Sequence, residues 1–355
     1  MADASRRLAR LRVDASAIAE NWRFFKNLAP SAMCAAVVKA DGYGLGAETA
    51  ARALAEAGAR VFFTATSGEA VRVRRVLGEG PQIFVLNGPT HDDVEHYASA
   101  HLTPVLNSMA QITLWAARAP AALHIDTGMN RLGIGPDERA AAAQALQGGE
   151  LELVMSHLAC ASTLTHEMNA RQRSDFIEAA QAFPRAPLSL ASTAGALIGA
   201  EYHFDLIRPG LGLYGSGGLD ADNPTLAVAA TIDAPILQVR DVEAGESFGY
   251  GATAIAPKPM RTATGALGYA DGFLRSLSGR GYGVLGGERR PILGRVSMDL
   301  VILDVTGCAE AIPGAMVEFL GANAPLDDIA ALAGTAPYEI LTTFAGTVRR
   351  TGASA

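Results

Sequence analysis

The feature that most constrains the fold is an alternation, over the first two thirds of the chain, of short Val/Ile/Leu-rich runs with longer alanine-rich segments. Helical patterns separate most of the runs, for instance at 47–57, 136–146 and 167–183, and another, at 14–28, precedes the first run. Parallel strands that are buried on both faces are hydrophobic along their whole length, as these runs are. Eight of them predict strands, at residues 33–38, 60–64, 82–86, 102–106, 121–126, 151–156, 187–191 and 204–208.

Eight strands with crossover segments predict a closed (β/α)8 TIM barrel, with a doubly wound open sheet as the alternative. After about residue 225 the long helical patterns nearly vanish, and alternating apolar runs such as 300–305 stand between Gly/Pro turns. A short helix at 326–333 and a strand at 8–13 are expected to belong to this second part. We therefore predict an α/β fold with two domains: the barrel at 12–225, and a mainly β domain at 226–355 that includes about residues 1–11.

Composition narrows the classes of function. The net charge is -7, so the basic footprint of a nucleic-acid binder is absent. No stretch approaches the roughly 18 to 20 apolar residues of a membrane span, and the charged start at 1–7 lacks an apolar signal core. The three cysteines, Cys34, Cys160 and Cys308, are far apart and have no metal-ligand spacing. We expect a cytoplasmic protein without a metal, a nucleic-acid partner or a membrane partner, and with buried reduced thiols.

Polar residues recur where the predicted barrel strands end, which is where such barrels place their chemistry. Lys39 follows the first strand, and burial there makes an amine more easily neutral and nucleophilic, as Schiff-base chemistry requires. A lysine that simply reaches the surface at a strand end is the alternative. Similar positions after the later strands hold Arg131, His157, Ser192, Thr193 and Arg208.

Phosphate groups in barrels often bind beside the loops after strands 7 and 8. Ser192, Thr193 and the backbone N–H groups around Gly210 and Leu211 are expected to meet there. A lysine that can trap an aldehyde and a phosphate site that faces the same cavity indicate pyridoxal 5′-phosphate (PLP). The glycine-rich turn at 40–46 has no Walker A spacing, which argues against a nucleotide loop.

Seven segments, in order along nearly the whole chain, resemble the motifs of alanine racemases, PLP enzymes that join a barrel to a β domain. They are VKADGYG (38–44), DTGMNRLG (126–133), MSHLA (155–159), RPGLGLYG (208–215), GYGAT (249–253), GYADG (268–272) and GRVSMD (294–299). The resemblance implies interconversion of L-alanine and D-alanine on a PLP Schiff base. D-Alanine would then be made for peptidoglycan or consumed in catabolism.

Inversion needs a base on each face of the substrate carbon. The resemblance assigns these bases to Lys39 and Tyr250. A free phenol has a pKa of about 10, so Tyr250 needs nearby positive charge or hydrogen bonds that stabilise its phenolate. By analogy with the family, His157 and Arg208 supply this stabilisation. Arg208 is also implied to face the pyridine nitrogen. A guanidinium cannot give that nitrogen a proton, so the ring remains a weaker electron sink and reprotonation is favoured over transamination.

The remaining implied contacts lie on loops. Arg131 resembles the family's arginine that contacts the cofactor's phenolic oxygen and the substrate carboxylate. Met298 resembles the residue whose main chain contacts that carboxylate. Tyr269 resembles a residue at the entrance of the active site. Asp299 supports the site beside Met298. The implied cofactor contacts are Lys39, Tyr43, Arg131, His157, Ser192, Thr193, Arg208, Gly210 and Leu211.

The chain departs from the family pattern at several places. Many relatives carry a carbamylated lysine that orients the arginine equivalent to Arg131, and here that position is His124. The Asn-Ser after strand 7 is Ser192-Thr193, and the Cys-Met-Asp triplet begins with Ser297. Relatives often have a phosphate-binding tyrosine near the C-terminus, whereas the last tyrosine here is Tyr338. The sequence thus predicts that another donor substitutes for that tyrosine or that cofactor affinity is lower.

Three other readings remain open from the sequence. A serine or broad-specificity racemase is possible because a small pocket discriminates weakly against one added hydroxyl. A PLP-dependent decarboxylase of the same barrel class would usually pair the pyridine nitrogen with an acid and use a catalytic cysteine, which Arg208 and Cys308 do not match. A non-catalytic PLP carrier would typically lack the β domain. Family dimers build each site from two chains, so a homodimer with shared sites is implied.

Overall fold

The computed structural model describes residues 8–115, 118, 120–344 and 349–352. Its contacts divide the chain into two compact units. The barrel unit comprises residues 16–42 and 46–227, and the β unit comprises residues 1–15, 43–45 and 228–355. Residues 1–7 of the predicted N-terminal part of the β domain lie outside the described residues.

The barrel unit is a ring of parallel strands, as the sequence predicted. Seven strands pair in chain order, from β3 to β9. The ring closes because β2 pairs in parallel with β10 and an isolated bridge joins Ser192 to Arg208. The strands are β2 (Met33–Cys34), β3 (Ala36–Val37), β4 (Val61–Thr64), β5 (Gln82–Val85), β6 (Thr103–Leu106), β7 (Ala121–His124), β8 (Leu151–Met155), β9 (Leu188–Ser189) and β10 (Leu206–Ile207).

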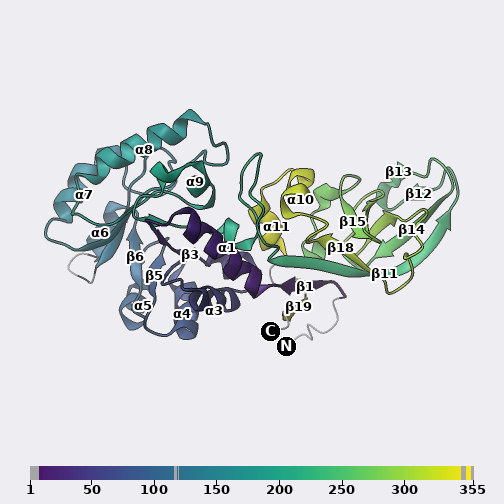
Figure 1. Ribbon diagram of the computed structural model, residues 1–355, viewed down its shortest axis with the longest axis horizontal. Helices are drawn as coiled ribbons and strands as arrows, with labels where there is room; N and C mark the ends of the chain where they lie inside the picture. Colours follow the sequence, from purple (N-terminus) through teal and green to yellow (C-terminus); the bar gives the residue numbers. More distant parts are fainter. Residues whose placement is uncertain (1–7, 116–117, 119, 345–348, 353–355) are drawn as a thin grey trace. The chain divides into compact units, whose positions relative to one another are not determined.

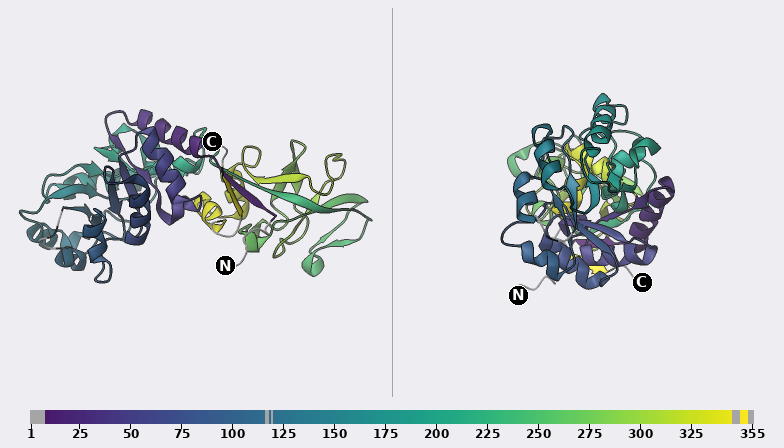
Figure 2. Two further views of the ribbon diagram at one scale, coloured as in Figure 1. Left: turned by 90° about the horizontal axis from the view of Figure 1, so that it is seen from below. Right: turned by 90° about the vertical axis from the view of Figure 1, so that its left-hand side faces the viewer.

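Helices lie outside this ring (Figure 1; Figure 2, right). They follow the predicted segments closely, and α3 coincides with the predicted 47–57. The helices are α1 (Ala15–Leu28), α3 (Ala47–Ala57), α4 (Ser67–Leu77), α5 (Val94–Ser99), α6 (Met109–Trp115), α7 (Arg139–Ala145), α8 (Glu167–Ala180) and α9 (Thr193–Ile198). The segment labelled α2 (Lys39–Tyr43) is a left-handed turn and not a regular helix. Short 3-10 turns are η2 (Pro136–Glu138), η3 (Ala200–Tyr202) and η4 (Leu211–Tyr214).

Large side chains of the barrel strands are buried. Phe62, Phe63 and Phe84 are fully buried, and the rings of Phe63 and Phe84 stack with centroids 4.9 Å apart. Phe62 and Phe63 are neighbours in β4, so their side chains lie on opposite faces of the ring of strands. Burying each aromatic ring removes a large apolar area from water, which stabilises the ring of strands. The packed interior leaves the strand ends and their loops as the place for chemistry.

The β unit is built around the long strand β11, which runs along the unit (Figure 1). β11 pairs antiparallel with β1, β14 and β18, so it links most of the sheet. The strands are β1 (Arg10–Val13), β11 (Ala230–Val242), β12 (Ser247–Phe248), β13 (Ala254–Ile255), β14 (Met260–Gly265), β15 (Tyr282–Leu285), β16 (Glu288–Pro291), β17 (Val301–Asp304), β18 (Met316–Leu320) and β19 (Arg349–Gly352).

Two predictions about this unit are confirmed. The strand expected at 8–13 is β1, which pairs with β11 and with β19. The helix expected at 326–333 is α10 (Leu326–Ala333). A second helix, α11 (Pro337–Thr343), was not predicted. Short 3-10 turns are η5 (Tyr250–Ala252), η6 (Tyr269–Asp271) and η7 (Arg275–Leu277).

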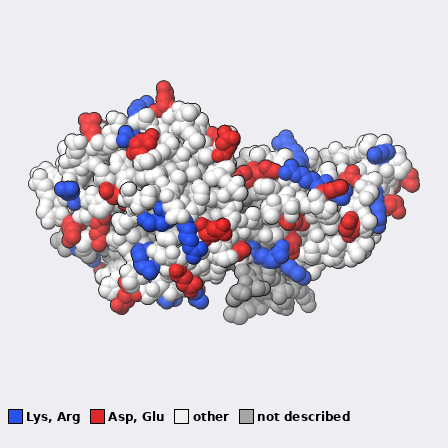
Figure 3. Space-filling view, in the orientation of Figure 1, with Lys and Arg blue, Asp and Glu red and all other residues white. Residues whose placement is uncertain are grey.

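The face shown in Figure 3 carries intermixed charges of both signs. None of the helices in the described part of the chain is both long and apolar enough to cross a bilayer. All three cysteines are free thiols, and Cys34 and Cys308 are buried. Cys160 is only partly buried, so the prediction that all three are buried was wrong for this residue.

Candidate active site

Lys39 lies directly after the first barrel strand. The apolar residue before it, Val38, is fully buried and donates its N–H to the carbonyl of Phe63 (2.9 Å), which anchors the lysine's backbone to β4. Burial lowers the pKa of Lys39, and the positive charges of Arg131 and Arg208 lower it further, while Glu69 opposes them. The amine therefore becomes neutral, and so nucleophilic, more easily than a surface lysine.

The turn after Lys39 is left-handed over four consecutive residues, of which three are not glycine. The φ angles of Ala40, Asp41, Gly42 and Tyr43 are 52°, 52°, 63° and 54°. Local hydrogen bonds hold this turn: the N–H of Gly42 donates to the carbonyl of Val38 (3.0 Å), and the Asp41 carboxylate accepts from the N–H of Ala47 (3.0 Å). L-residues avoid this region, so the conformation persists because its surroundings fix it.

Arg131 stands at the end of a turn that is organised by one carboxylate. Oδ1 of Asp126 accepts from the N–H groups of Gly128 and Met129, both at 2.9 Å, and Oδ2 accepts from Asn130 (3.0 Å). Asn130 has a φ of 56°, which asparagine tolerates better than most residues. The turn brings the exposed Arg131 close enough to depress the pKa of Lys39.

Arg208 is buried under the site. Its guanidinium donates to the Ser189 hydroxyl and to the carbonyls of Ser156 (2.7 Å) and Leu190 (3.2 Å). Burial lowers the pKa of Arg208 to about 9, so the group stays protonated at neutral pH. Nη2 also lies 3.5 Å from Nδ1 of His157.

This contact fixes the state of His157. A guanidinium can only donate, so Nδ1 must be the acceptor and the ring proton lies on Nε2. Burial and the charge of Arg208 lower the pKa of His157 well below its usual value, and a neutral ring agrees with this tautomer. His157 therefore offers an Nε2–H donor whose direction is set by Arg208, as the predicted support for Tyr250 requires.

The loops after the last two barrel strands are tied together by Thr193. Its Oγ1 accepts from the N–H groups of Gly210 (2.9 Å) and Gly212 (3.1 Å). Gly212 permits close packing, because a Cβ there would lie 2.3 Å from the ring of Phe25. The predicted phosphate contacts Ser192, Thr193, Gly210 and Leu211 are thus gathered at one end of the barrel unit.

His124, which stands where many relatives have a lysine, is bonded to Asn107 (Nδ1 to Oδ1, 2.8 Å). The Asn107 amide nitrogen donates to the carbonyls of Leu86 (2.9 Å) and Val105 (2.8 Å), so its oxygen is the acceptor and His124 carries its proton on Nδ1. Burial, followed by the charge of Arg208, lowers the pKa of His124 to about 4. A neutral imidazole stands here, with the Nε2 lone pair left as an acceptor.

The predicted site residues of the β unit gather on exposed loops. Tyr250, Met298 and Tyr269 are 70%, 55% and 43% exposed, and Asp299 is also exposed. Backbone hydrogen bonds join two of these loops, from Tyr269 N–H to the Ser297 carbonyl (3.0 Å) and from Ala270 N–H to the Met298 carbonyl (2.9 Å). The turn of Tyr250 lies against the same loop, since a Cβ on Gly251 would be 3.1 Å from Nη1 of Arg295. We call the exposed residues Tyr250, Tyr269, Met298 and Asp299 the β-unit loop surface.

Tyr338 is the second residue of helix α11, which was not predicted and which begins at Pro337. Its ring centroid lies 6.0 Å from that of Tyr43, one of the predicted phosphate contacts. Tyr43 is buried, and this burial raises the pKa of its hydroxyl, which keeps the phenol neutral. A tyrosine from the C-terminal part of the chain is thus beside Tyr43, although the sequence alone indicated no such residue.

Several positioning residues were missed by the sequence reasoning. Gln172, on α8, is fully buried and donates to the Thr127 hydroxyl (3.2 Å) and the His157 carbonyl (3.0 Å). Asn107 and Ser189 hold His124 and Arg208. The only feature of the sequence that could have indicated Gln172 is that a polar residue stands at a core-facing position of a helix. No feature of the sequence indicated Asn107 or Ser189.

A (β/α)8 barrel with a lysine at the end of its first strand is an arrangement typical of enzymes that place their chemistry at the strand ends. Residues 13–217 match the family model "Alanine racemase, N-terminal domain", and residues 229–352 match "Alanine racemase, C-terminal domain". The chain therefore belongs to the alanine racemase family, and the predicted family and fold are confirmed.

Individual relatives agree with this assignment. The chain is 44% identical over 361 residues to "Alanine racemase" of Rhodospirillum rubrum, covering 96% of this chain and 95% of that protein. It is 43% identical over 352 residues to "Alanine racemase, catabolic" of Agrobacterium fabrum, covering 96% and 91%. The alanine racemase of Bartonella henselae with covalently bound pyridoxal phosphate superposes with a TM-score of 0.92 at 34% identity, covering 98% of this chain and 99% of that one.

Proposed function

We propose that this protein interconverts L-alanine and D-alanine as a PLP-dependent racemase in which Lys39 bonds the cofactor. The observation that carries the proposal is the amine of Lys39 at the end of the first barrel strand, with its pKa lowered by burial and by Arg131 and Arg208. The alanine racemase of Bartonella henselae, which is similar to this chain, holds pyridoxal phosphate covalently.

The donor set of the barrel unit fits PLP at three points. The amine of Lys39, whose lowered pKa lets it become neutral more easily than a surface lysine, suits the aldehyde. The loop after β10 suits the phosphate, to which Leu211 offers its N–H and Ser192 a hydroxyl. The N–H of Gly210 donates to Thr193 and so holds this loop in place. Arg208 offers the pyridine nitrogen a guanidinium, and no carboxylate contacts Arg208 among the described residues. We also assign Tyr43 to the phosphate, as the family resemblance implies.

PLP, once bonded to the amino acid, withdraws electrons and makes the Cα–H bond acidic. Lys39 then holds or returns the proton on one face of Cα, and Tyr250 does so on the other. His157 supports Tyr250 through its Nε2–H, because Arg208 occupies Nδ1. Arg131 takes the substrate carboxylate, with Met298, Asp299 and Tyr269 around it. Each of these roles follows the family resemblance and remains part of the proposal.

The functional form that we propose is a homodimer with shared sites. The β-unit loop surface leaves Tyr250 and Met298 largely exposed in one chain. Large exposed side chains that belong to a site are explained if they meet the barrel unit of a second copy. We further propose a cytoplasmic location, in which the three free thiols would stay reduced.

The decarboxylase alternative is weaker because Cys308 is buried, and Arg208, not an acid, is proposed for the pyridine nitrogen. Serine or broader racemisation remains a variant of the same chemistry. The chain is similar both to relatives named catabolic and to a solved structure named biosynthetic. The proposal therefore includes both the synthesis of D-alanine and its consumption.

The test is to incubate purified protein with PLP and L-alanine and to follow D-alanine by chiral chromatography. The wild type should form D-alanine, and Lys39→Ala, whose thermal stability is checked in parallel, should form none. L-Serine in place of L-alanine measures substrate breadth. PLP-loaded wild type that forms no D-alanine would refute the assignment.

A further inference from the structure

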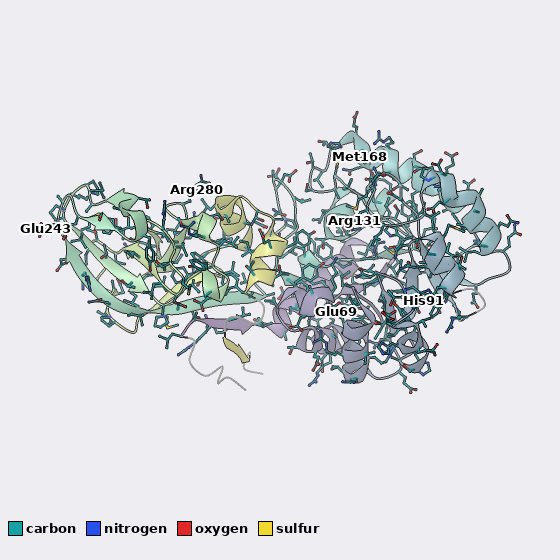
Figure 4. All side chains as sticks on the ribbon, turned by 180° about the vertical axis from the view of Figure 1, so that it is seen from behind. Glu69, His91, Arg131, Met168, Glu243 and Arg280 are labelled. Atoms are coloured by element: carbon teal, nitrogen blue, oxygen red, sulfur yellow. The ribbon has the colours of Figure 1, made fainter. Side chains whose placement is uncertain are left out.

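We propose that Glu69 is the positioning residue for Lys39: its carboxylate bonds the first amide after the lysine and fixes the left-handed turn from which the amine projects. The proposal rests on the function assigned above, since it concerns how Lys39 is presented to an aldehyde. Figure 4 marks Glu69 on the barrel unit, together with Arg131.

Both oxygens of Glu69 accept from backbone groups beside strand ends. Oε1 accepts from the N–H of Ala40 at 2.9 Å, and Oε2 accepts from the N–H of Ala65 at 2.8 Å. Ala40 follows Lys39 after β3, and Ala65 follows β4, which is the neighbouring strand. One carboxylate thus joins the two loops at the C-terminal ends of adjacent strands.

Ordinary helix capping does not explain this arrangement. Thr66 is the N-cap of α4, and its Oγ1 accepts from the N–H of Glu69 (3.3 Å). In a reciprocal capping box the glutamate would return a bond to the N–H of the cap residue, Thr66. Here its oxygens go instead to Ala65, which precedes the cap, and to Ala40, which is 29 positions away in sequence. The long-range bond serves the lysine turn.

The turn needs such support because Ala40 has a φ of 52°, a region that alanine rarely adopts. A charge-assisted hydrogen bond to its N–H is stronger than a neutral one. Asp41 makes the analogous bond at the other end of the turn, to Ala47. Two carboxylates therefore hold the backbone on the C-terminal side of Lys39, and this restricts where Nζ can point.

The charge of Glu69 also acts on the amine. Burial, Arg131 and Arg208 all favour the neutral form of Lys39, and Glu69 acts against them. Glu69 therefore has two separable effects: its oxygen places the turn, and its negative charge raises the pH at which the amine loses its proton.

Glu69→Gln and Glu69→Ala separate these effects. Glutamine keeps an oxygen that can accept from Ala40 but has no charge, whereas alanine removes both. Glu48→Gln and Glu48→Ala are matched controls, because Glu48 is an exposed acid in the first turn of α3, beside the same loop. Far-UV circular dichroism and melting temperature establish that each variant is folded.

The first measurement is competitive acetylation of the apoprotein across pH, followed at each lysine by mass spectrometry. Lys26 and Lys258 lie elsewhere in the chain and serve as internal references. Loss of the negative charge should move the midpoint of Lys39 to lower pH in both Glu69 variants, because Glu69 raises the pKa of the amine. The midpoints of Lys26 and Lys258 should not move, and the Glu48 variants should match the wild type at all three lysines.

The second measurement is the rate at which apoprotein becomes covalently loaded with PLP at Lys39, trapped with borohydride. Glu69→Ala should slow loading about tenfold, as loss of a charge-assisted hydrogen bond predicts, and Glu69→Gln should lie closer to the wild type. The kcat for D-alanine formation should fall in the same order, with a smaller change in KM. Glu69 variants that match the Glu48 controls in both measurements would overturn the proposal.

Failure of this inference is distinguishable from failure of the proposed function. Acetylation reports on Lys39 without cofactor or substrate, so it stays informative if the wild type forms no D-alanine. A wild type that racemises alanine while Glu69→Ala loads PLP at the normal rate would retain the function and reject the role of Glu69.

Discussion

Single residues give this site an unusual balance of charge. Lys39, Arg131 and Arg208 bring positive charge to one end of the barrel, while His124 and His157 are held neutral by burial and by that same charge. Neutral histidines avoid a further cation beside Lys39, which would depress its pKa more. Tautomers that are fixed by Asn107 and Arg208 make each ring a defined donor or acceptor.

These histidines predict how stability depends on pH. The pKa of His124 is about 4 in the folded protein and about 6.5 when unfolded. Between these values the unfolded state binds a proton that the folded state does not, so the free energy of unfolding should fall as pH falls from about 7 towards 4. The slope reaches about 1.4 kcal/mol per pH unit for each such ring.

Urea unfolding of the wild type and of His124→Gln, measured at several pH values, checks this prediction. The variant should lose part of the slope, whatever its stability at pH 8. His91→Gln is the control, since His91 is exposed. An unchanged slope in His124→Gln would contradict the assignment of a buried neutral ring.

Thr193 supports a second prediction at this scale. Thr193→Val keeps the shape of the side chain but leaves the N–H groups of Gly210 and Gly212 without their acceptor, at a cost of about 1–3 kcal/mol for each buried group. The Kd for PLP should rise tenfold or more by equilibrium dialysis, and Thr193→Ser should bind nearly as the wild type. Equal affinities for the valine and serine variants would argue against a role for this hydroxyl.

Candidate site residues were marked in the sequence by a motif or a strand end, as at Lys39, Arg131, His157 and Arg208, and their roles stay predictions. Their partners were not marked, because Asn107, Gln172 and Ser189 meet the site through hydrogen bonds between distant positions. Tyr338 shows the same limit, since its proximity to Tyr43 depends on helix α11. The periodicity of apolar residues predicts helices and strands, but it does not predict which distant residues are hydrogen-bonded or packed together in the fold.

At the scale of elements, the barrel strands were predictable because each is a continuous apolar run. The first run, 33–38, is divided into β2 and β3, which pair with different neighbours. This division occurs where the ring closes, so it depends on the whole barrel and has no local signal. The helix α11 was missed because its seven residues give too short a pattern.

The loop after β10 gives a prediction about an element. A Cβ on Gly212 would lie 2.3 Å and 2.4 Å from two ring atoms of Phe25 and 2.9 Å from Cγ2 of Thr193. Phe25 is fully buried on α1 and cannot move freely, so Gly212→Ala should shift the loop and cost about 1–3 kcal/mol.

Thermal unfolding and PLP titration of Gly212→Ala should show a lower melting temperature and weaker binding. Gly135→Ala is the matched control, because Gly135 has a φ of -73° and its Cβ would meet nothing within 4 Å. If both alanine variants behave alike, the packing of α1 against this loop does not position the phosphate contacts.

At the scale of the whole molecule, the proposed site needs residues from both units. The barrel unit holds Lys39, Arg131, His157 and Arg208, and the β unit carries Tyr250 on the β-unit loop surface. If one chain's loop surface completes the site of a second chain, loss of Lys39 and loss of Tyr250 are complementary defects. A heterodimer of the two variants then contains one site with both lesions and one with neither.

Mixing Lys39→Ala chains with Tyr250→Phe chains should therefore restore part of the activity that each homodimer lacks. Random reassortment of equal amounts makes about half of the dimers mixed, each with one intact site, so recovery should approach about a quarter of wild-type activity. Differently tagged chains, purified in tandem, isolate the mixed species, and chiral chromatography measures its D-alanine formation. Mixed dimers of Lys39→Ala with Lys39→Ala;Tyr250→Phe chains are the control and should stay inactive. Inactive heterodimers of verified composition would place Lys39 and Tyr250 of one chain in the same site. Each site would then lack one of the two residues, so no site would be intact.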